Sequence, residues 1–211
     1  LRRVGNVAEM GSRERAGSVA ISNAALRVEF DTATGAMEVA DRRTGGVVRQ
    51  SAGTQIVVKW AKVEGASTLR VGAWDPVEGL DLEISVEMDR SGPEFGVVVA
   101  AKGRMRQALA YPGPFVTGPG TYLVVPMNEG ISYPVGDASI APMRLIAYGG
   151  HGICMGFWGA TDGGAGHMAI IETPDDAAIR IGRREGLLSV ATERDPQKGE
   201  FGYARKLSSA F

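Results

Sequence analysis

Two histidines and one cysteine are the first residues to consider for chemistry. His151 lies three residues before Cys154, but a His-x-x-Cys pair with no second pair nearby is a weak zinc motif. The apolar residues around Cys154 favour a buried core thiol. The glycine-rich segment Asp162–Gly166 is not followed by a helix pattern, so it predicts a hairpin loop and not a phosphate site. We therefore expect no metal and no cofactor.

Carboxylates are the remaining catalytic candidates, because glycosidases work with two of them about 5–10 Å apart. Pro126-Met-Asn-Glu-Gly-Ile-Ser-Tyr-Pro134 places Glu129 on a tight, proline-flanked loop, and binding groups concentrate on such loops. The sequence does not pair Glu129 with a second carboxylate, which favours a structural turn carboxylate. We predict no catalytic residue, and retain Asn128 and Glu129 as candidate substrate-binding residues. The other carboxylates in informative settings are Asp162, Glu172, Asp175 and Asp176.

An acidic cluster after the segment His167–Glu172 has two interpretations. Asp175 and Asp176 together with Glu172 offer oxygen ligands for calcium. Thr173-Pro-Asp-Asp-Ala-Ala is also a good turn sequence, in which the aspartates cap a short helical turn. The turn is the favoured interpretation.

Tryptophans can stack on sugar rings, since an indole offers a flat apolar face to axial C–H groups. Trp60 and Trp158 lie inside apolar runs, so we expect both in the core. Trp74 lies in Gly72-Ala-Trp-Asp-Pro76, which is typical of a loop. Trp74 is therefore the third candidate substrate-binding residue.

The elements that position these residues are predicted to be strands. Apolar and polar residues alternate strictly over Ala24–Asp31 and over Leu80–Asp89, which is the period of an antiparallel strand with one solvated face. About ten further short runs, each bounded by Gly, Pro, Asp or Asn, extend the pattern. Only Gly103–Leu109 and Asp175–Ala178 suggest a helical turn. The sequence predicts an all-β fold, a large antiparallel β-sandwich.

The domain organisation follows from the same pattern. We expect residues 1–17 to be a flexible lead-in and residues 18–211 to form a single sandwich domain, truncated at its C-terminus. Tyr111–Gly120 is too rich in proline and glycine for a central strand. Either an interdomain linker or an ordered crossover loop fits it, and the crossover loop is favoured because both flanks have the same strand pattern.

Composition limits the partners. Glycine is abundant at 30 residues, in keeping with many turns, and the net charge is −1. A balanced charge attracts neither nucleic acid nor an anionic membrane surface, so neither is an expected partner. No apolar run reaches the roughly 20 residues that a membrane-spanning helix needs.

Four segments resemble a known family. They are Ile21–Gly35, Val125–Ile131, Gly149–Ala177 and Gly199–Lys206. Together they resemble the galactose-mutarotase-like supersandwich that precedes the catalytic barrel in some bacterial glycoside hydrolases, including relatives of the endo-α-N-acetylgalactosaminidases. The resemblance covers residues 18–211 but includes no catalytic signature.

The resemblance implies a non-catalytic accessory domain that braces a following barrel of the same chain and helps line its substrate cleft, with carbohydrate as the partner. It favours a secreted or periplasmic location, although the sequence leaves the compartment open. Two alternatives remain: a free-standing, lectin-like carbohydrate-binding module, and a mutarotase or epimerase using His151 or His167 with Glu129.

Overall fold

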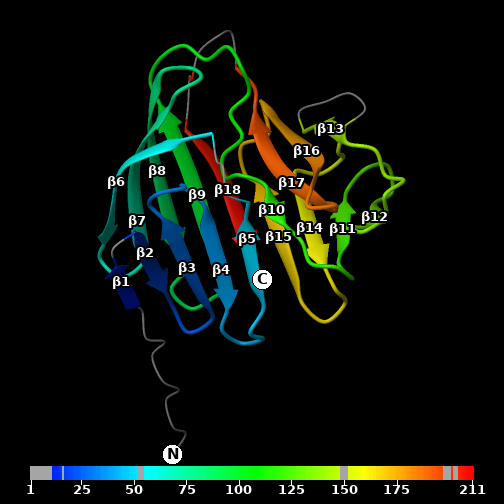
Figure 1. Ribbon diagram of the computed structural model, residues 1–211, viewed down its shortest axis with the longest axis horizontal. Helices are drawn as coiled ribbons and strands as arrows, with labels where there is room; N and C mark the ends of the chain where they lie inside the picture. The colour runs from blue at the N-terminus through cyan, green and yellow to red at the C-terminus, as the bar shows by residue number, and fades with distance from the viewer. Residues whose placement is uncertain (1–10, 16, 52–54, 148–151, 197–200, 202–203) are drawn as a thin grey trace, which may run out of the picture.

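The computed structural model describes residues 11–15, 17–51, 55–147, 152–196, 201 and 204–211. These residues form 18 strands and no helix. Two nine-stranded antiparallel sheets face each other in a sandwich (Figure 1). The chain thus has the predicted fold class, an all-β fold built as a large antiparallel sandwich, and the described residues include no helix that could cross a membrane.

The first sheet, called sheet A, contains strands from both halves of the chain. In spatial order it consists of β1 (Gly11–Arg15), β2 (Ser18–Ser22), β3 (Leu26–Asp31), β4 (Met37–Asp41), β5 (Val47–Gln50), β10 (Phe115–Val116), β17 (Leu187–Arg194), β16 (Ala177–Arg184) and β13 (Met143–Ile146).

The second sheet, called sheet B, lies behind sheet A in Figure 1. In spatial order it consists of β12 (Ile131–Pro134), β11 (Tyr122–Val125), β14 (Phe157–Thr161), β15 (Gly166–Ile171), β18 (Arg205–Ala210), β9 (Glu94–Ala101), β8 (Leu80–Met88), β7 (Thr68–Asp75) and β6 (Val57–Glu64).

Alternating side chains build the core, as predicted. Leu26, Val28 and Phe30 of β3 are completely buried, and the apolar residues of β8 point inward in the same way. The apolar interior divides into two clusters. The first lies between β2–β4 of sheet A and β6–β9 of sheet B. The second lies between β10, β13, β16 and β17 of sheet A and β11, β14, β15 and β18 of sheet B. The sheets continue across both clusters.

Two expectations about the ends of elements need correction. Residues 11–15 of the expected lead-in form the edge strand β1, because their backbone pairs with β2 along its length; residues 1–10 lie outside the described part. Neither expected helical turn forms within the described residues, and Asp175 and Asp176 instead occupy a turn before β16.

The segment Tyr111–Gly120 is a crossover between the two halves. Phe115 pairs with Gln50 of β5 on one side and with Val190 of β17 on the other, so β10 is a central strand (Figure 1). This contradicts the expectation that the segment cannot contribute a central strand. The physical reason is that the pairing needs only Phe115 and Val116, neither of which is a proline.

Candidate functional site

The predicted binding residues Asn128 and Glu129 lie on the exposed turn between β11 and β12. Asn128 adopts a positive φ of 54°, and the Gly130 amide donates a 2.9 Å hydrogen bond to the Met127 carbonyl. Asn tolerates this backbone region better than most residues. The Glu129 side chain is therefore exposed on a well-formed tight turn.

Cys154 fixes the base of this turn. Its amide donates to the Pro126 carbonyl at 2.8 Å, and its thiol donates to the same oxygen at 2.9 Å. The thiol is exposed, so the expectation of a buried core cysteine is wrong. The reason is that the strand begins only at Phe157, which leaves Cys154 in the connection ahead of it. His151 lies outside the described residues.

Trp74 lies far from the Asn128–Glu129 turn. It is the outward residue near the end of β7, in a strand and not in the expected loop. Six strand steps separate β11 from β7 in sheet B, which corresponds to about 29 Å at the usual strand spacing. The three sequence-predicted binding residues therefore belong to two separate surfaces.

Trp60 joins Trp74 on the second surface. The ladder between β6 and β7 shifts register between Val58 and Trp60, which makes Lys59 the extra residue of a β-bulge. Val58 packs against the core, and side chains on a regular strand alternate with a period of two. Without the bulge, Trp60 would therefore point inward like Val58. With it, Trp60 is 48% exposed, so the expectation of a core tryptophan is wrong.

Gly72 lies beneath the indole of Trp60. The two residues are register partners, and a Cβ atom at position 72 would lie 2.2 Å from the Trp60 Nε1 atom. Only glycine leaves room for the ring to lie against the sheet here. Trp74, two residues further along β7, faces the same side and is 38% exposed. We call Trp60, Gly72 and Trp74 the tryptophan platform.

A signal for this platform exists in the sequence. The residues of β6 that pack against the core are Val58, Ala61 and Val63. The step of three between Val58 and Ala61 breaks the period of two, as a bulge does. A glycine inside the strand opposite is the second sign, because it marks close approach of another group.

A separate cleft of about 320 Å³ lies between the sheets. Its walls include Phe115 from β10, Trp158 and His167 from β14 and β15, and Phe211. The His167 ring stacks on Phe211 with centroids 4.7 Å apart and meets Trp158 edge-on at 5.2 Å. Trp158 is in the core as predicted, and its Nε1 donates to Thr192 Oγ1 at 3.1 Å.

The environment of His167 keeps its imidazole ring buried and neutral. Its Nε2 atom is buried and has no hydrogen-bond partner among the described residues. Burial lowers the pKa of His167 to about 3, because the charged form would lose its hydration. A neutral imidazole in this aromatic setting does not supply the near-neutral pKa of a general acid–base pair.

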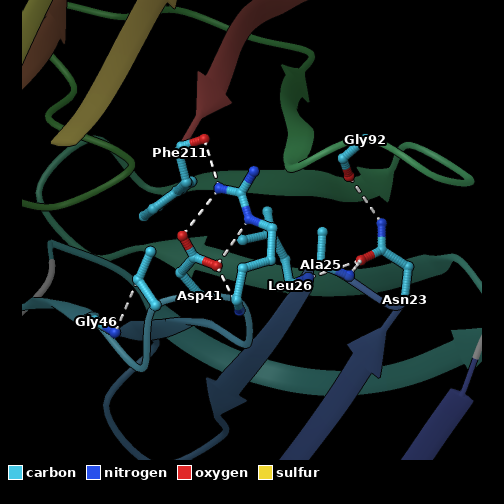
Figure 2. Close-up of polar contacts among 9 residues, drawn as sticks. Asn23, Ala25, Leu26, Asp41, Gly46, Gly92 and Phe211 are labelled. Atoms are coloured by element: carbon cyan, nitrogen blue, oxygen red, sulfur yellow. Dashed lines mark hydrogen bonds and ion pairs between the residues drawn. The ribbon is translucent and has the colours of Figure 1, made fainter. Parts of the chain in front are cut away.

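Asp41, at the rim of the cleft, is held by an arginine. Arg43 donates from Nη2 to Asp41 Oδ2 at 2.9 Å and to the Phe211 carbonyl at 2.8 Å (Figure 2). This hydrogen bonding lowers the pKa of Asp41 to about 2. The Arg43 guanidinium thus ties the β4–β5 turn to Phe211, and the Asp41 carboxylate accepts hydrogen bonds from the same guanidinium (Figure 2).

Three of the other candidate carboxylates have structural partners. Asp162 accepts hydrogen bonds from the Gly164 and Ala165 amides, which confirms the predicted hairpin loop. Asp176 forms an ion pair with Arg205, and both side chains are only 1% exposed. Glu172 accepts from Ser208 at 2.8 Å. The described residues contain no group of three potential metal ligands.

The fold defines the class of protein: a large antiparallel β-sandwich of two nine-stranded sheets. No protein-family model matches the sequence, and no curated protein sequence matches it either. The likeness is seen among solved structures. The α-N-acetylgalactosaminidase NagBb from Bifidobacterium bifidum, in complex with GalNAc, superposes with a TM-score of 0.74 at 14% identity. The match covers 90% of this chain and 35% of that one.

Two further structures share the fold. A galactose mutarotase related enzyme from Lactobacillus acidophilus matches with a TM-score of 0.52 at 7% identity, over 92% of this chain and 96% of that one. A TPR-domain containing protein from Parabacteroides distasonis matches with a TM-score of 0.61 at 8% identity, over 91% and 46% of the two chains. The chain spans about a third of the length of the N-acetylgalactosaminidase. At these identities the likeness is one of fold.

Proposed function

We propose that this chain is a non-catalytic β-sandwich domain of a carbohydrate-active enzyme, in which it braces a catalytic domain of the same polypeptide. The observation that carries the proposal is the match of nine-tenths of this chain to only a third of an N-acetylgalactosaminidase. A sandwich of this fold can thus be one part of a larger glycosidase.

The state of the titratable groups supports a non-catalytic role. A mutarotase or epimerase needs a base and an acid close to the reacting carbon. Burial holds His167 neutral, with its pKa lowered to about 3, and Glu129 lies on a turn outside the cleft that His167 lines. No second histidine is available among the described residues.

An exposed apolar surface on sheet B supports the bracing role. Tyr122 of β11 and Met168 and Ile170 of β15 point outward and are 37–46% exposed. With the half-buried Val124 and Phe157 between them, they form what we call the apolar face. Contiguous apolar surface of this kind marks an interaction site. We assign it to the catalytic domain.

The Asn128–Glu129 turn follows directly from β11, beside the apolar face. A catalytic domain packed on that face would have the turn at its border. In this proposal the turn helps to line the substrate cleft. Replacing Asn128–Gly130 by a shorter turn in the natural enzyme should then lower kcat/KM about tenfold or more, and an unchanged kcat/KM would remove the turn from the cleft.

The direct test is the size of the natural polypeptide. The chain has a mass of 22.2 kDa, and the proposal requires a substantially longer product with a catalytic domain. Intact mass spectrometry of the protein from its source decides this. In that longer protein, Met168→Lys with Ile170→Lys should separate the unfolding transitions of the two domains. A natural product of about 22 kDa would contradict the proposal.

A further inference from the structure

We propose that the tryptophan platform is a binding surface for neutral saccharides, separate from the bracing role. β7 lies four strand steps from β15, or about 19 Å across sheet B. A domain covering the apolar face can leave the platform open to solvent. The inference therefore goes beyond the proposed function and does not depend on it.

The backbone of β6 and β7 holds the Trp60 indole on the outer face of sheet B. A large aromatic ring exposed to water costs free energy that core burial would recover. Here the bulge at Lys59 turns Trp60 outward, and Gly72, which has no side chain, leaves room for the Trp60 ring. Trp74 presents a second indole about 7 Å further along the same face of β7. Two indoles at this spacing suit neighbouring residues of one oligosaccharide.

Polar groups surround the platform and provide partners for sugar hydroxyls. Asp81 is the register partner of Trp74 and forms an ion pair with Lys59. Glu83 is the register partner of Gly72, is exposed, and has no ion-pair partner among the described residues. A carboxylate accepts hydrogen bonds from two hydroxyl groups at once. Apolar ring faces beside such acceptors match the two sides of a pyranose.

The charge balance selects a neutral ligand. Lys62 lies over the Trp60 ring at 5.7 Å and pairs with Glu64, which also contacts Arg70. The cations around the platform are Lys59, Lys62 and Arg70, and the anions are Glu64, Asp81 and Glu83, so the local charge sums to zero. Neither a polyanion nor a strongly cationic peptide finds a complementary field here.

The test uses the three tryptophan indoles of the chain as reporters. The 211-residue protein is labelled with ¹⁵N-tryptophan and titrated with galactose, N-acetylgalactosamine and maltohexaose. The Trp60 and Trp74 indole signals should shift with at least one of these probes, while the buried Trp158 signal should not. Trp60→Ala and Trp74→Ala should each weaken the affinity about tenfold.

Matched variants separate the platform from general surface effects. Tyr122→Ala removes another exposed aromatic residue of sheet B and should leave the affinity unchanged. Glu83→Gln should weaken binding severalfold without changing the Trp60 environment. The proposal is overturned if neither indole responds to any of the three probes, if Tyr122→Ala weakens binding as much as Trp60→Ala, or if the indoles shift only with protein concentration, which indicates contact with a second copy.

Discussion

The indole of Trp60 occupies the space that a side chain on Gly72 would need, since a Cβ atom there would meet Nε1 at 2.2 Å and Cε2 at 2.3 Å. The two residues are partners across the β6–β7 ladder, next to the bulge at Lys59. Trp60 therefore owes its exposed position to two backbone features and not to its own polarity.

Gly72→Ala should displace the Trp60 ring. The added methyl group cannot coexist with the present ring position, so the ring swings into solvent and loses its contact with the sheet. We expect a red shift of tryptophan fluorescence and a loss of about 1 kcal/mol in the free energy of unfolding. Gly182→Ala is the control, because a Cβ atom there meets nothing within 4 Å. Equal spectra for the two variants would contradict this assignment.

His167 should make stability depend on pH in mildly acidic solution. Its pKa is about 3 in the folded protein, against 6.5 in the unfolded chain, so only the unfolded state takes up this proton as the pH falls below 6.5. The contribution of the neutral, buried His167 to the free energy of unfolding is fully present above pH 6.5 and is lost as the pH falls toward 3. The slope is about 1.4 kcal/mol per pH unit, which lowers Tm by about 3–5 °C per unit.

His167→Phe is the variant that isolates this effect. Phenylalanine keeps the aromatic contacts to Phe115, Trp158 and Phe211 and cannot titrate. Calorimetric scans between pH 7 and pH 5 should show a flatter Tm profile for the variant. If wild type and variant lose Tm in parallel, His167 is not buried in its neutral form.

Asp41 should make the stability of the fold depend on pH in a more acidic range than His167 does. Hydrogen bonds from Arg43 hold its pKa at about 2, below the ordinary 3.8, so its contribution is present above about pH 4 and is lost as the pH falls toward 2. Asp41→Asn should reduce stability at pH 6 by about 1 kcal/mol. The reduction should shrink between pH 4 and pH 2 in denaturant titrations, and a constant difference would refute the assignment.

The Asp176–Arg205 ion pair should be far more important for stability than surface pairs. Both side chains are 1% exposed, and the Arg205 guanidinium also lies 3.9 Å from the centroid of the Phe201 ring. Asp176→Ala leaves this cation buried without its carboxylate, which costs about 3–5 kcal/mol. Glu38→Ala in the exposed Glu38–Arg49 pair should cost at most about 1 kcal/mol. Similar losses in urea unfolding would contradict the contrast.

Local patterns in the sequence predict much of the fold. The alternation of Leu26, Val28 and Phe30, and that over Leu80–Met88, follows directly from the side-chain period of a strand, and both sets are buried as expected. The order of strands does not follow from such patterns. β18 inserts between β15 and β9, which are distant from one another in sequence, and only packing of the whole sandwich determines that position.

The candidate site was predicted less well for a related reason. Trp60 and Cys154 both lie in apolar runs, and apolar runs predict burial. A bulge of one residue reverses the direction of Trp60, and a late strand start leaves Cys154 outside the sheet. Asn128 and Glu129 lie on an exposed turn, as the prolines and glycine of their loop indicate.

One NMR experiment tests the central claim that this sandwich recognises saccharide without transforming it. Exchange spectroscopy of galactose with the ¹⁵N-tryptophan-labelled chain reads the interconversion of α and β anomers, while the indole signals read binding of the neutral probes. We predict shifts at Trp60 and Trp74, none at Trp158, and an anomer exchange rate equal to that in buffer. Accelerated anomer exchange would contradict the claim, and so would Trp60 and Trp74 indole signals that do not shift with any of the neutral probes.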